Sequence, residues 1–285
     1  MTTAADKPVW FITGCSTGFG RALARHTLSL GYPTVVTARN AAQVADIAAD
    51  YPDLALVLAL DVTVHAQVQA AVDAAQGRFG RIDVLVNNAG VGYFGSLEES
   101  DLEAVRAMFE INVWGLTQMT RAVLPGMRQR RSGTVVNLSS VGGLVAFPTL
   151  SFYNASKFAV EALSESLAQE VAPLGLKVLL VEPGPFRTDW AGRSAAEAPR
   201  TIPDYDATAG ARTQMIRGYS GTQPGDPERA AAAIVQAVEA DHPPLRLLLG
   251  EMALQTATAK LAAMQQEIAG WAAVSRGADY PASEC

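Results

Sequence analysis

Short apolar runs alternate with longer stretches of helical periodicity along most of the chain. The runs predict buried strands at residues 9–12, 34–37, 54–60, 84–87, 134–138, 178–181 and 245–249. Apolar positions at helical spacing predict helices at residues 21–30, 41–50, 64–79, 102–131, 152–172 and 227–240. This alternation is typical of parallel βαβ units with right-handed crossovers. The pattern therefore predicts an α/β fold: a doubly wound, Rossmann-type parallel sheet of seven strands with helices on both faces.

Two segments depart from the alternation. Residues 187–226 are rich in Ala, Gly, Pro and Thr, and their helical spacing is weak, which leaves disorder or a lid as the alternatives. We favour a lid that carries Trp190 and Tyr205, because the segment follows a strand end. Residues 251–271 predict a C-terminal helix, followed by a tail to residue 285 that frays. We interpret residues 1–285 as one catalytic domain with these two additions.

A glycine-rich turn joins the first strand to the first helix. Gly14, Gly18 and Gly20 follow the G-x-x-x-G-x-G spacing, whereas the common dinucleotide fingerprint is G-x-G-x-x-G. Glycines let the backbone approach a pyrophosphate, and the free N–H groups of a helix start bind the anion. The turn predicts a phosphate cradle, although each glycine by itself could serve only a tight turn.

A second group of residues predicts a proton-transfer centre. Tyr153 and Lys157 are one helical turn apart, which places the phenol and the ammonium on one face, and Ser140 follows a strand just upstream. A free tyrosine titrates near ~10, so a pKa of about 7 requires roughly 3 units, on the order of 4 kcal/mol. We expect the lysine, together with a cationic cofactor, to lower the tyrosine pKa in this way.

Several motifs in register resemble the single-domain short-chain dehydrogenase/reductase family. The resemblance covers roughly residues 9–250 and rests on Thr13 to Gly20, Asn87-Asn88-Ala89-Gly90, Asn112, Ser140, Tyr153-x-x-x-Lys157 and Pro183-Gly184. It implies an NAD(P)-dependent enzyme that interconverts a ketone or aldehyde and an alcohol by hydride transfer. Because members of the family often end soon after the last strand, the helix at 251–271 makes the usual tetramer contacts uncertain. We expect a homo-oligomer, either a dimer or a tetramer.

The resemblance also implies a role for each motif residue. Tyr153 would exchange a proton with the substrate oxygen, Ser140 would hold that oxygen, and Lys157 would lower the phenol pKa and bind the nicotinamide ribose. Asn112 would order a water that relays protons. Each has a plainer alternative: Ser140 could cap a helix, Lys157 could be solvated, and Asn112 could bond to backbone. The expected cofactor-binding residues are Gly14, Ser16, Thr17, Gly18, Phe19, Gly20, Arg39, Asp61, Val62, Asn87, Ala89, Gly90, Tyr153, Lys157, Pro183, Gly184, Phe186 and Thr188.

The end of the second strand predicts the choice between NAD and NADP. In such sheets an acidic residue there binds the ribose hydroxyls of NAD, whereas a nearby arginine accommodates the 2′-phosphate of NADP. This chain has Arg39 and no Asp or Glu at that point. We therefore favour NADP(H) over NAD(H); the alternative is that Arg39 only faces solvent. Asp61 resembles the adenine contact of the family, or it could cap the helix that begins near residue 64.

Apolar side chains are expected around the substrate. They favour a hydrophobic ketone or secondary alcohol over a sugar or amino acid. The residues that we expect to contact it are Tyr93, Phe94, Val141, Leu144, Phe147, Trp190 and Tyr205.

Other functions fit fewer of the residues. The Gly14–Gly18 stretch also matches G-x-S-x-G, the nucleophile elbow of α/β hydrolases, but no upstream loop can supply an oxyanion hole for Ser16. A redox sensor that binds NADP(H) without turnover would need only the cradle and not the residues around Tyr153. An epimerase or dehydratase typically acts on sugar nucleotides, and the sequence predicts no second basic diphosphate pocket.

Composition narrows the partners and the compartment. A net charge of −6 and a pI near 5.1 disfavour binding to nucleic acid and anionic membranes. Apolar runs are shorter than the roughly 20 residues that span a bilayer, so we expect no membrane insertion. Residues 1–7 lack a signal-peptide pattern, and only Cys15 and Cys285 are present. We therefore predict a reducing, cytoplasmic setting, and we expect no metal site.

Overall fold

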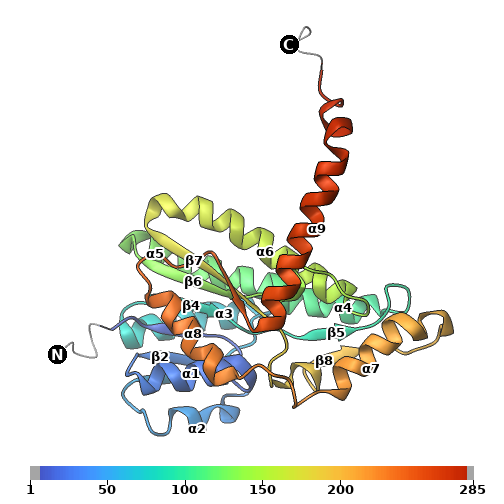
Figure 1. Ribbon diagram of the computed structural model, residues 1–285. Helices are drawn as coiled ribbons and strands as arrows, with labels where there is room; N and C mark the ends of the chain where they lie inside the picture. The colour runs from blue at the N-terminus through green and yellow to red at the C-terminus, as the bar shows by residue number, and fades with distance from the viewer. Residues whose placement is uncertain (1–6, 281–285) are drawn as a thin grey trace.

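A seven-stranded parallel sheet forms the centre of the computed structural model, which describes residues 7–280 (Figure 1). Every pairing in this sheet is parallel. Side by side, the strands are β3 (Ala55–Ala59), β2 (Thr34–Ala38), β1 (Trp10–Ile12), β4 (Val84–Asn87), β6 (Gly133–Leu138), β7 (Leu176–Pro183) and β9 (Arg246–Leu249). The predicted doubly wound fold is confirmed.

Helices cover both faces of this sheet. α1 (Gly18–Ser29) and α8 (Pro227–Glu239) pack on one face, and α3 (His65–Phe79), α5 (Leu116–Arg130) and α6 (Ser151–Val171) pack on the other. Strand β1 shows why the runs are continuously apolar: Trp10 and Ile12 enter the first core, and Phe11 enters the second. Alternate side chains of a strand point to opposite faces, so a strand covered on both sides needs apolar residues throughout.

Strand order places the functional motifs at one edge. The chain passes from β1 outward to β2 and β3 and then returns to β4 on the other side of β1. Ligands of doubly wound sheets bind at the carboxyl ends of the strands beside such a reversal. The glycine turn follows β1, Asn88 follows β4, and Ser140 follows β6.

Two predicted helices are interrupted. The helix expected at 102–131 consists of α4 (Leu102–Phe109), a π-helical turn η3 (Glu110–Gly115) and α5. The helix expected at 41–50 is a 3₁₀ turn (Ala41–Gln43) followed by the four-residue α2 (Ala45–Ala48). Apolar periodicity indicates where a helix lies. It does not show where the backbone hydrogen bonds of that helix change locally to a π or 3₁₀ pattern.

Residues 187–226 fold over the carboxyl edge of the sheet. They contain two 3₁₀ turns, η6 (Asp189–Ala191) and η7 (Pro203–Tyr205), then the π turn η8 (Asp206–Gly210) and α7 (Ala211–Gly218). The short strand β8 (Ala195–Glu197) pairs in parallel with β5 (Gly92–Phe94), a strand that the sequence did not indicate. This second sheet joins the segment to the loop after β4, which favours a lid over disorder, and the lid stays a prediction.

Helix α9 (Glu251–Arg276) extends the predicted C-terminal helix by five residues. It begins directly after β9 and then leaves the body of the molecule (Figure 1). Residues 277–280 follow it, and the remainder of the predicted tail lies outside the described residues. No helix within residues 7–280 is long and apolar enough to cross a membrane.

Candidate active site

The glycine turn after β1 opens onto the N-terminus of α1. Gly14 and Gly18 have φ values of +70° and +57°, a region that favours glycine. Thr17 caps α1 without a side-chain hydrogen bond, and the first turn of α1 contains no acidic residue. The first N–H groups of α1 are therefore not satisfied by a cap, and the helix dipole favours an anion there. Ser16, Thr17, Gly18 and Phe19 line a groove of about 850 Å³ at this point, a volume typical of ligand sites.

The carboxyl ends of β1 and β4 are joined by hydrogen bonds. The Asn88 amide donates to the carbonyls of Thr13 and Gly14 at 2.8 and 2.9 Å, and the Thr13 hydroxyl accepts from the N–H groups of Asn88 and Ala89. These bonds hold Ala89 and Gly90 in the wall of the groove. Asn87 differs from the expectation: its side chain is buried and donates to Thr120 and Asn137, so Asn88 takes its place beside the groove.

Gly20 has an ordinary φ, but close packing leaves no room for a side chain at this position. A Cβ at this position would lie 2.4 Å from Asn88 Nδ2 and 2.5 Å from the Gly14 carbonyl oxygen. We expect Gly20→Ala to lower the free energy of unfolding by about 2 kcal/mol, measured by urea denaturation, because overpacking forces the turn to shift. Gly77→Ala in α3 is the control: no atom lies within 4 Å of its added Cβ, so it should stabilise by roughly 0.5–1 kcal/mol. Equal effects of the two variants would contradict the tight packing.

Arg39 and Asp61 form the far end of the groove, together with Val62. The Arg39 side chain is exposed, and none of the salt bridges found within residues 7–280 includes it. Asp61 accepts hydrogen bonds from the N–H and hydroxyl of Thr63. Although desolvation raises the pKa of Asp61, these bonds and the charge of Arg39 hold that pKa below its ordinary value. The residue that caps α3 is Val64, so the alternative of Asp61 as the helix cap is wrong.

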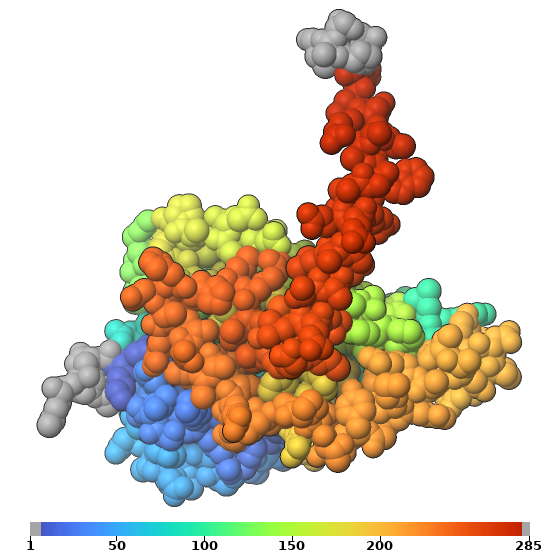
Figure 2. Space-filling view, viewed as in Figure 1, coloured from blue at the N-terminus to red at the C-terminus, as the bar shows by residue number. Residues whose placement is uncertain are grey.

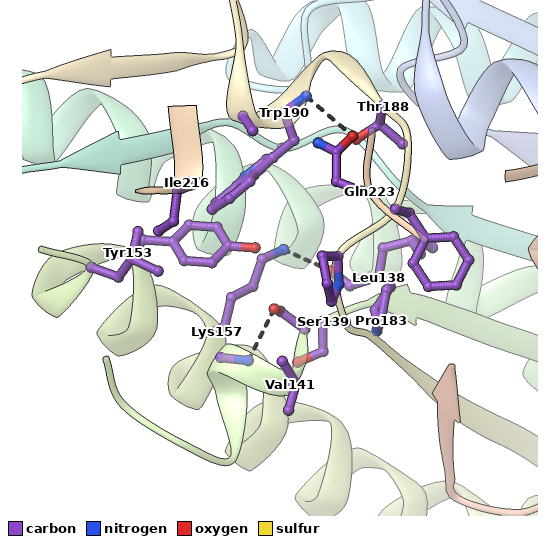
Figure 3. A pocket seen from close by; sticks show the side chains of 18 of the residues that line it. Leu138, Ser139, Val141, Tyr153, Lys157, Pro183, Thr188, Trp190, Ile216 and Gln223 are labelled. Atoms are coloured by element: carbon purple, nitrogen blue, oxygen red, sulfur yellow. Dashed lines mark hydrogen bonds between the residues drawn. The ribbon is translucent and has the colours of Figure 1, made fainter. Parts of the chain in front are cut away.

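Tyr153 and Lys157 lie together in a cavity beside the groove. Both lie on α6 and are buried, and Lys157 Nζ lies 5.8 Å from the centre of the Tyr153 ring (Figure 3). Lys157 Nζ also donates to the Leu138 carbonyl at 2.7 Å, which anchors it to the end of β6. Ser140 accepts a hydrogen bond from Gly142 N–H at 3.0 Å and caps the 3₁₀ turn η4 (Val141–Gly143). The cap orients the Ser140 hydroxyl beside Tyr153.

Burial dominates the protonation of this pair. It raises the pKa of Tyr153 to about 12, and the hydrogen bond with Ser140 offsets only part of that rise. It lowers the pKa of Lys157 to about 8 against the opposing charge of Glu161. The expectation that Lys157, together with a cationic cofactor, lowers the Tyr153 pKa stays a prediction. Desolvation penalises the phenolate and the ammonium alike, so the buried phenol keeps its proton.

Asn112 lies in the π-helical turn η3 and faces the loop after β4. Its amide donates to the Val91 carbonyl at 2.9 Å and to Ser156, and its oxygen accepts from Val91 N–H at 2.9 Å. The extra residue of a π turn re-aims a side chain out of the regular helical pattern, and such turns are frequent at functional sites. Asn112 thus fixes Val91, next to Gly90 in the groove, and the expected water relay stays a prediction.

Known proteins resemble this chain along most of its length. The short chain dehydrogenase family model matches residues 8–198. The chain belongs to the short-chain dehydrogenase family. It is 45% identical to a short-chain dehydrogenase from Streptomyces avermitilis, whose crystal structure superposes with a TM-score of 0.90 and covers 96% of this chain and 100% of the other. A 3-ketodihydrosphingosine reductase of Bacteroides thetaiotaomicron is 37% identical over 85% of this chain and 87% of the relative.

A second structure shows what such a groove binds in a similar protein. A short-chain dehydrogenase/reductase from Burkholderia phymatum in complex with NAD is 28% identical, with a TM-score of 0.81 and coverage of 93% of this chain and 97% of the other. Other similar structures contain NADP. This short-chain dehydrogenase is thus an oxidoreductase of CH–OH and C=O groups that uses a nicotinamide coenzyme. The uncapped α1 start and the close approach of Gly14 to Ala89 fit the pyrophosphate of such a coenzyme.

An apolar cavity adjoins the groove of this short-chain dehydrogenase. Phe19, Asn88, Gly90, Val91, Thr188 and Trp190 line both spaces, so the two are continuous. Ser140, Tyr153, Lys157, Pro183, Gly184 and Phe186 line the cavity, and Phe186 packs on Phe19 with ring centres 5.0 Å apart. The structure thus brings most residues of the family motifs to one continuous site, whereas Thr13, Cys15, Gly20, Asn87 and Asn112 line neither space.

The seven expected substrate contacts separate into three groups. Val141, Phe147 and Trp190 line the cavity, and Trp190 packs on Tyr153 with ring centres 4.8 Å apart. Tyr93 lines the groove instead. The cavity does not include Leu144, Phe94 or Tyr205. Phe94 is fully buried behind Trp190, and the Tyr205 hydroxyl donates to Glu98 away from the cavity, so the substrate proposal leaves these three out.

Other cavity residues were not evident from the sequence. They come from the loop before α6, from the 187–226 segment and from the first turn of α9: Leu150, Ala191, Arg212, Ile216, Tyr219, Gln223 and Met252. The apolar spacing within α7 could have indicated Ile216. Nothing in the local pattern indicates Met252, because its position depends on how α9 crosses the end of β7.

A pair of carboxylates, Glu161 and Glu182, shares Arg246, and the charge of Glu161 acts on Lys157. Glu182 is fully buried, and neither of its carboxyl oxygens accepts a hydrogen bond within residues 7–280. Arg246 Nε lies 3.4 Å from Glu182 and 3.2 Å from Glu161, and Arg246 also pairs with the half-exposed Glu165. Burial, followed by the charge of Glu161, raises the pKa of Glu182 to about 8 despite Arg246.

This pair predicts a pH-dependent stability. The folded chain holds a proton on Glu182 up to a pKa of about 8, whereas its ordinary value is 4.5. Between these values the folded state binds more protons, so stability falls as pH rises from about 5 to 8. We expect Glu182→Gln to flatten that slope and to stabilise by on the order of 2 kcal/mol at pH 8, measured by urea unfolding across this range. Glu165→Gln is the control, and a slope unchanged in Glu182→Gln would refute the assignment.

Proposed function

We propose that this short-chain dehydrogenase interconverts a hydrophobic ketone or aldehyde and the corresponding alcohol with NADP(H). The observation that carries the proposal is the group formed by the buried Tyr153 and Lys157 with the partly buried Ser140, which lies where an apolar cavity opens into the dinucleotide groove. A reacting carbonyl in this cavity would be within reach of a proton donor and shielded from water. A bound nicotinamide supplies or accepts the hydride in this chemistry.

Side chains of the protein transfer the proton to and from the substrate oxygen. The Ser140 hydroxyl, oriented by its bond from Gly142, holds the substrate oxygen. The Tyr153 hydroxyl gives its proton to that oxygen during reduction and takes it back during oxidation. Because burial raises the pKa of the phenol further above neutral pH, the chain by itself is prepared for reduction. Lys157, anchored on the Leu138 carbonyl, provides the positive charge beside the phenol when a phenolate forms.

The groove supports the choice of NADP(H). The exposed Arg39 lies at the end of β2, and no carboxylate is present at that strand end to repel a phosphate. A guanidinium binds phosphate with paired, charge-assisted hydrogen bonds. Gly14, the α1 start and Thr188 would hold the remainder of the coenzyme along the groove.

The cavity supports an apolar substrate. Its walls are mainly aliphatic and aromatic, and the polar side chains among them include Ser140, Tyr153, Lys157, Arg212 and Gln223. Such a lining gains free energy from each buried methylene group but offers few partners to a polyhydroxylated molecule. The similar protein of Bacteroides is named as a reductase of a keto compound, which agrees with reduction as the direction.

A panel of carbonyl compounds tests this proposal. NADPH oxidation, followed by absorbance, should give kcat/KM at least about tenfold higher for 2-octanone than for 2-butanone, since each buried CH₂ contributes about 0.8 kcal/mol. Dihydroxyacetone is the polar control and should react more slowly than either. Faster reaction of the polar ketone would overturn the apolar assignment. Tight NADPH binding without oxidation of any compound in a broad panel would favour the redox sensor instead.

A further inference from the structure

Helix α9 carries an apolar stripe that residues 7–280 leave uncovered. Ala253 and Ala257 are buried against the body, but from Thr258 to Arg276 all side chains except that of Ala272 are exposed. Figure 2 shows this part of the chain standing clear of the molecule. Leu261, Ile268 and Trp271 are each exposed to about 65%. At 1.5 Å per residue, the projecting part is about 28 Å long.

Apolar residues of α9 follow a heptad spacing. Leu254, Ala257, Leu261, Met264, Ile268 and Trp271 are separated by three, four, three, four and three residues, and all of them except the buried Ala257 are exposed. This is the seam of a two-stranded coiled coil, in which each side chain of the seam inserts between residues of a second helix. A surface helix that packs on its own domain shows a wider stripe, and a helix without a partner is marginal in water at this length.

We propose that α9 pairs antiparallel with α9 of a second copy of this chain and makes the enzyme a homodimer. In this arrangement Leu261 of each copy lies against Met264 of the other, and Trp271 lies against the half-exposed Leu254 near the root of the other arm. The inference concerns assembly and does not depend on the proposed cofactor or substrate. It also gives the homo-oligomer expected from the sequence a specific surface.

The charges of α9 favour a second copy of the chain over a membrane as the partner of the apolar stripe. α9 contains two acidic residues, Glu251 and Glu267, and two basic residues, Lys260 and Arg276, so its net charge is zero. Helices that lie on a membrane surface are rich in Lys and Arg on their polar face. Lys260 and Glu267 are seven residues apart and therefore flank the same side of the seam. In an antiparallel pair, Lys260 of each copy lies beside Glu267 of the other, which gives two ion pairs. The charges that flank the seam are therefore complementary between the two copies.

Sedimentation velocity of the full chain tests the dimer directly. Wild type should have a mass about twice the 30.0 kDa of one chain. Ile268→Glu should weaken the dimer by at least about 100-fold, because two unpaired charges enter the seam. Ala262→Glu adds the same charge on the opposite face of α9 and should leave the dimer intact. Circular dichroism of each variant checks that the body remains folded.

A charge swap tests the pairing direction. Lys260→Glu should weaken the dimer by roughly threefold to tenfold, and combining it with Glu267→Lys should restore wild-type association, since exposed ion pairs of a helix pair contribute modestly. The proposal is overturned by a monomeric wild type, or by a dimer that Ile268→Glu leaves unchanged. Failure of the double variant to restore association would overturn the antiparallel pairing. Binding of monomeric wild type to phosphatidylcholine–phosphatidylserine vesicles, lost in Ile268→Glu, would assign the stripe to lipid and also overturn the proposal.

Discussion

Tyr153→Phe should lower kcat for carbonyl reduction by about 10³-fold, within the range for the loss of a general acid. The ring, which packs on Trp190 with centres 4.8 Å apart, stays in place, so the cavity keeps its shape. NADPH binding, measured by fluorescence titration, should change by less than about twofold, because the substitution removes only the proton donor.

Tyr205→Phe is the matched control for this experiment. It removes the same hydroxyl from a tyrosine that donates to Glu98, outside the cavity. Its turnover should equal that of wild type. If Tyr153→Phe also retained near wild-type kcat, Tyr153 would not be the proton donor, and the proposed mechanism would fail even if the protein bound NADPH.

Arg39→Ala should raise KM for NADPH by roughly 10- to 100-fold and leave KM for NADH within about threefold. The loss corresponds to one charge-assisted hydrogen-bonding group, about 1.5–3 kcal/mol. The side chain is exposed and lines the groove, so its removal should not disturb the core. Initial rates with each coenzyme at a saturating ketone concentration give both constants.

Arg229→Ala removes the same charge at a distance from the groove. It therefore controls for the effect of the net charge of the protein on the binding of NADPH. Arg229 lies on α8 with a side chain that is 90% exposed. Equal KM values for the two coenzymes in wild type, unchanged in Arg39→Ala, would show that Arg39 only faces solvent. This result would refute the proposed preference for NADP(H), but it would not affect the proposed role of Tyr153.

The glycine turn and the placement of Tyr153 beside Lys157 could be predicted because their geometry is local. The turn that contains Gly14 and Gly18 needs backbone conformations that glycine favours, so its sequence marks it. Tyr153 and Lys157 share a face because one helical turn separates them, whatever the remainder of the chain does. Asn87 shows the limit of this reasoning. Neighbouring residues at a strand end point in opposite directions, and the structure turned Asn88 toward the groove and Asn87 into the core.

The substrate cavity could not be predicted in the same way. Tyr205 and Ile216 both belong to the segment over the site, but the pairing of β8 with β5 directs Ile216 into the cavity and leaves Tyr205 beside Glu98. That pairing joins residues about 100 positions apart, and neither three-residue strand has a periodicity that local sequence could reveal. Side-chain direction in this segment is therefore a tertiary property.

The sequence by itself determined the seven buried strands, the helices between them and the placement of Tyr153 beside Lys157, because strands buried on both faces require unbroken apolar runs and helical spacing puts these two residues on one face. Only the tertiary structure decided which apolar residues surround the substrate, and that α9 leaves the body with its seam exposed. It also raised the pKa of Tyr153, since that pKa depends on how much water the assembled chain removes from the phenol.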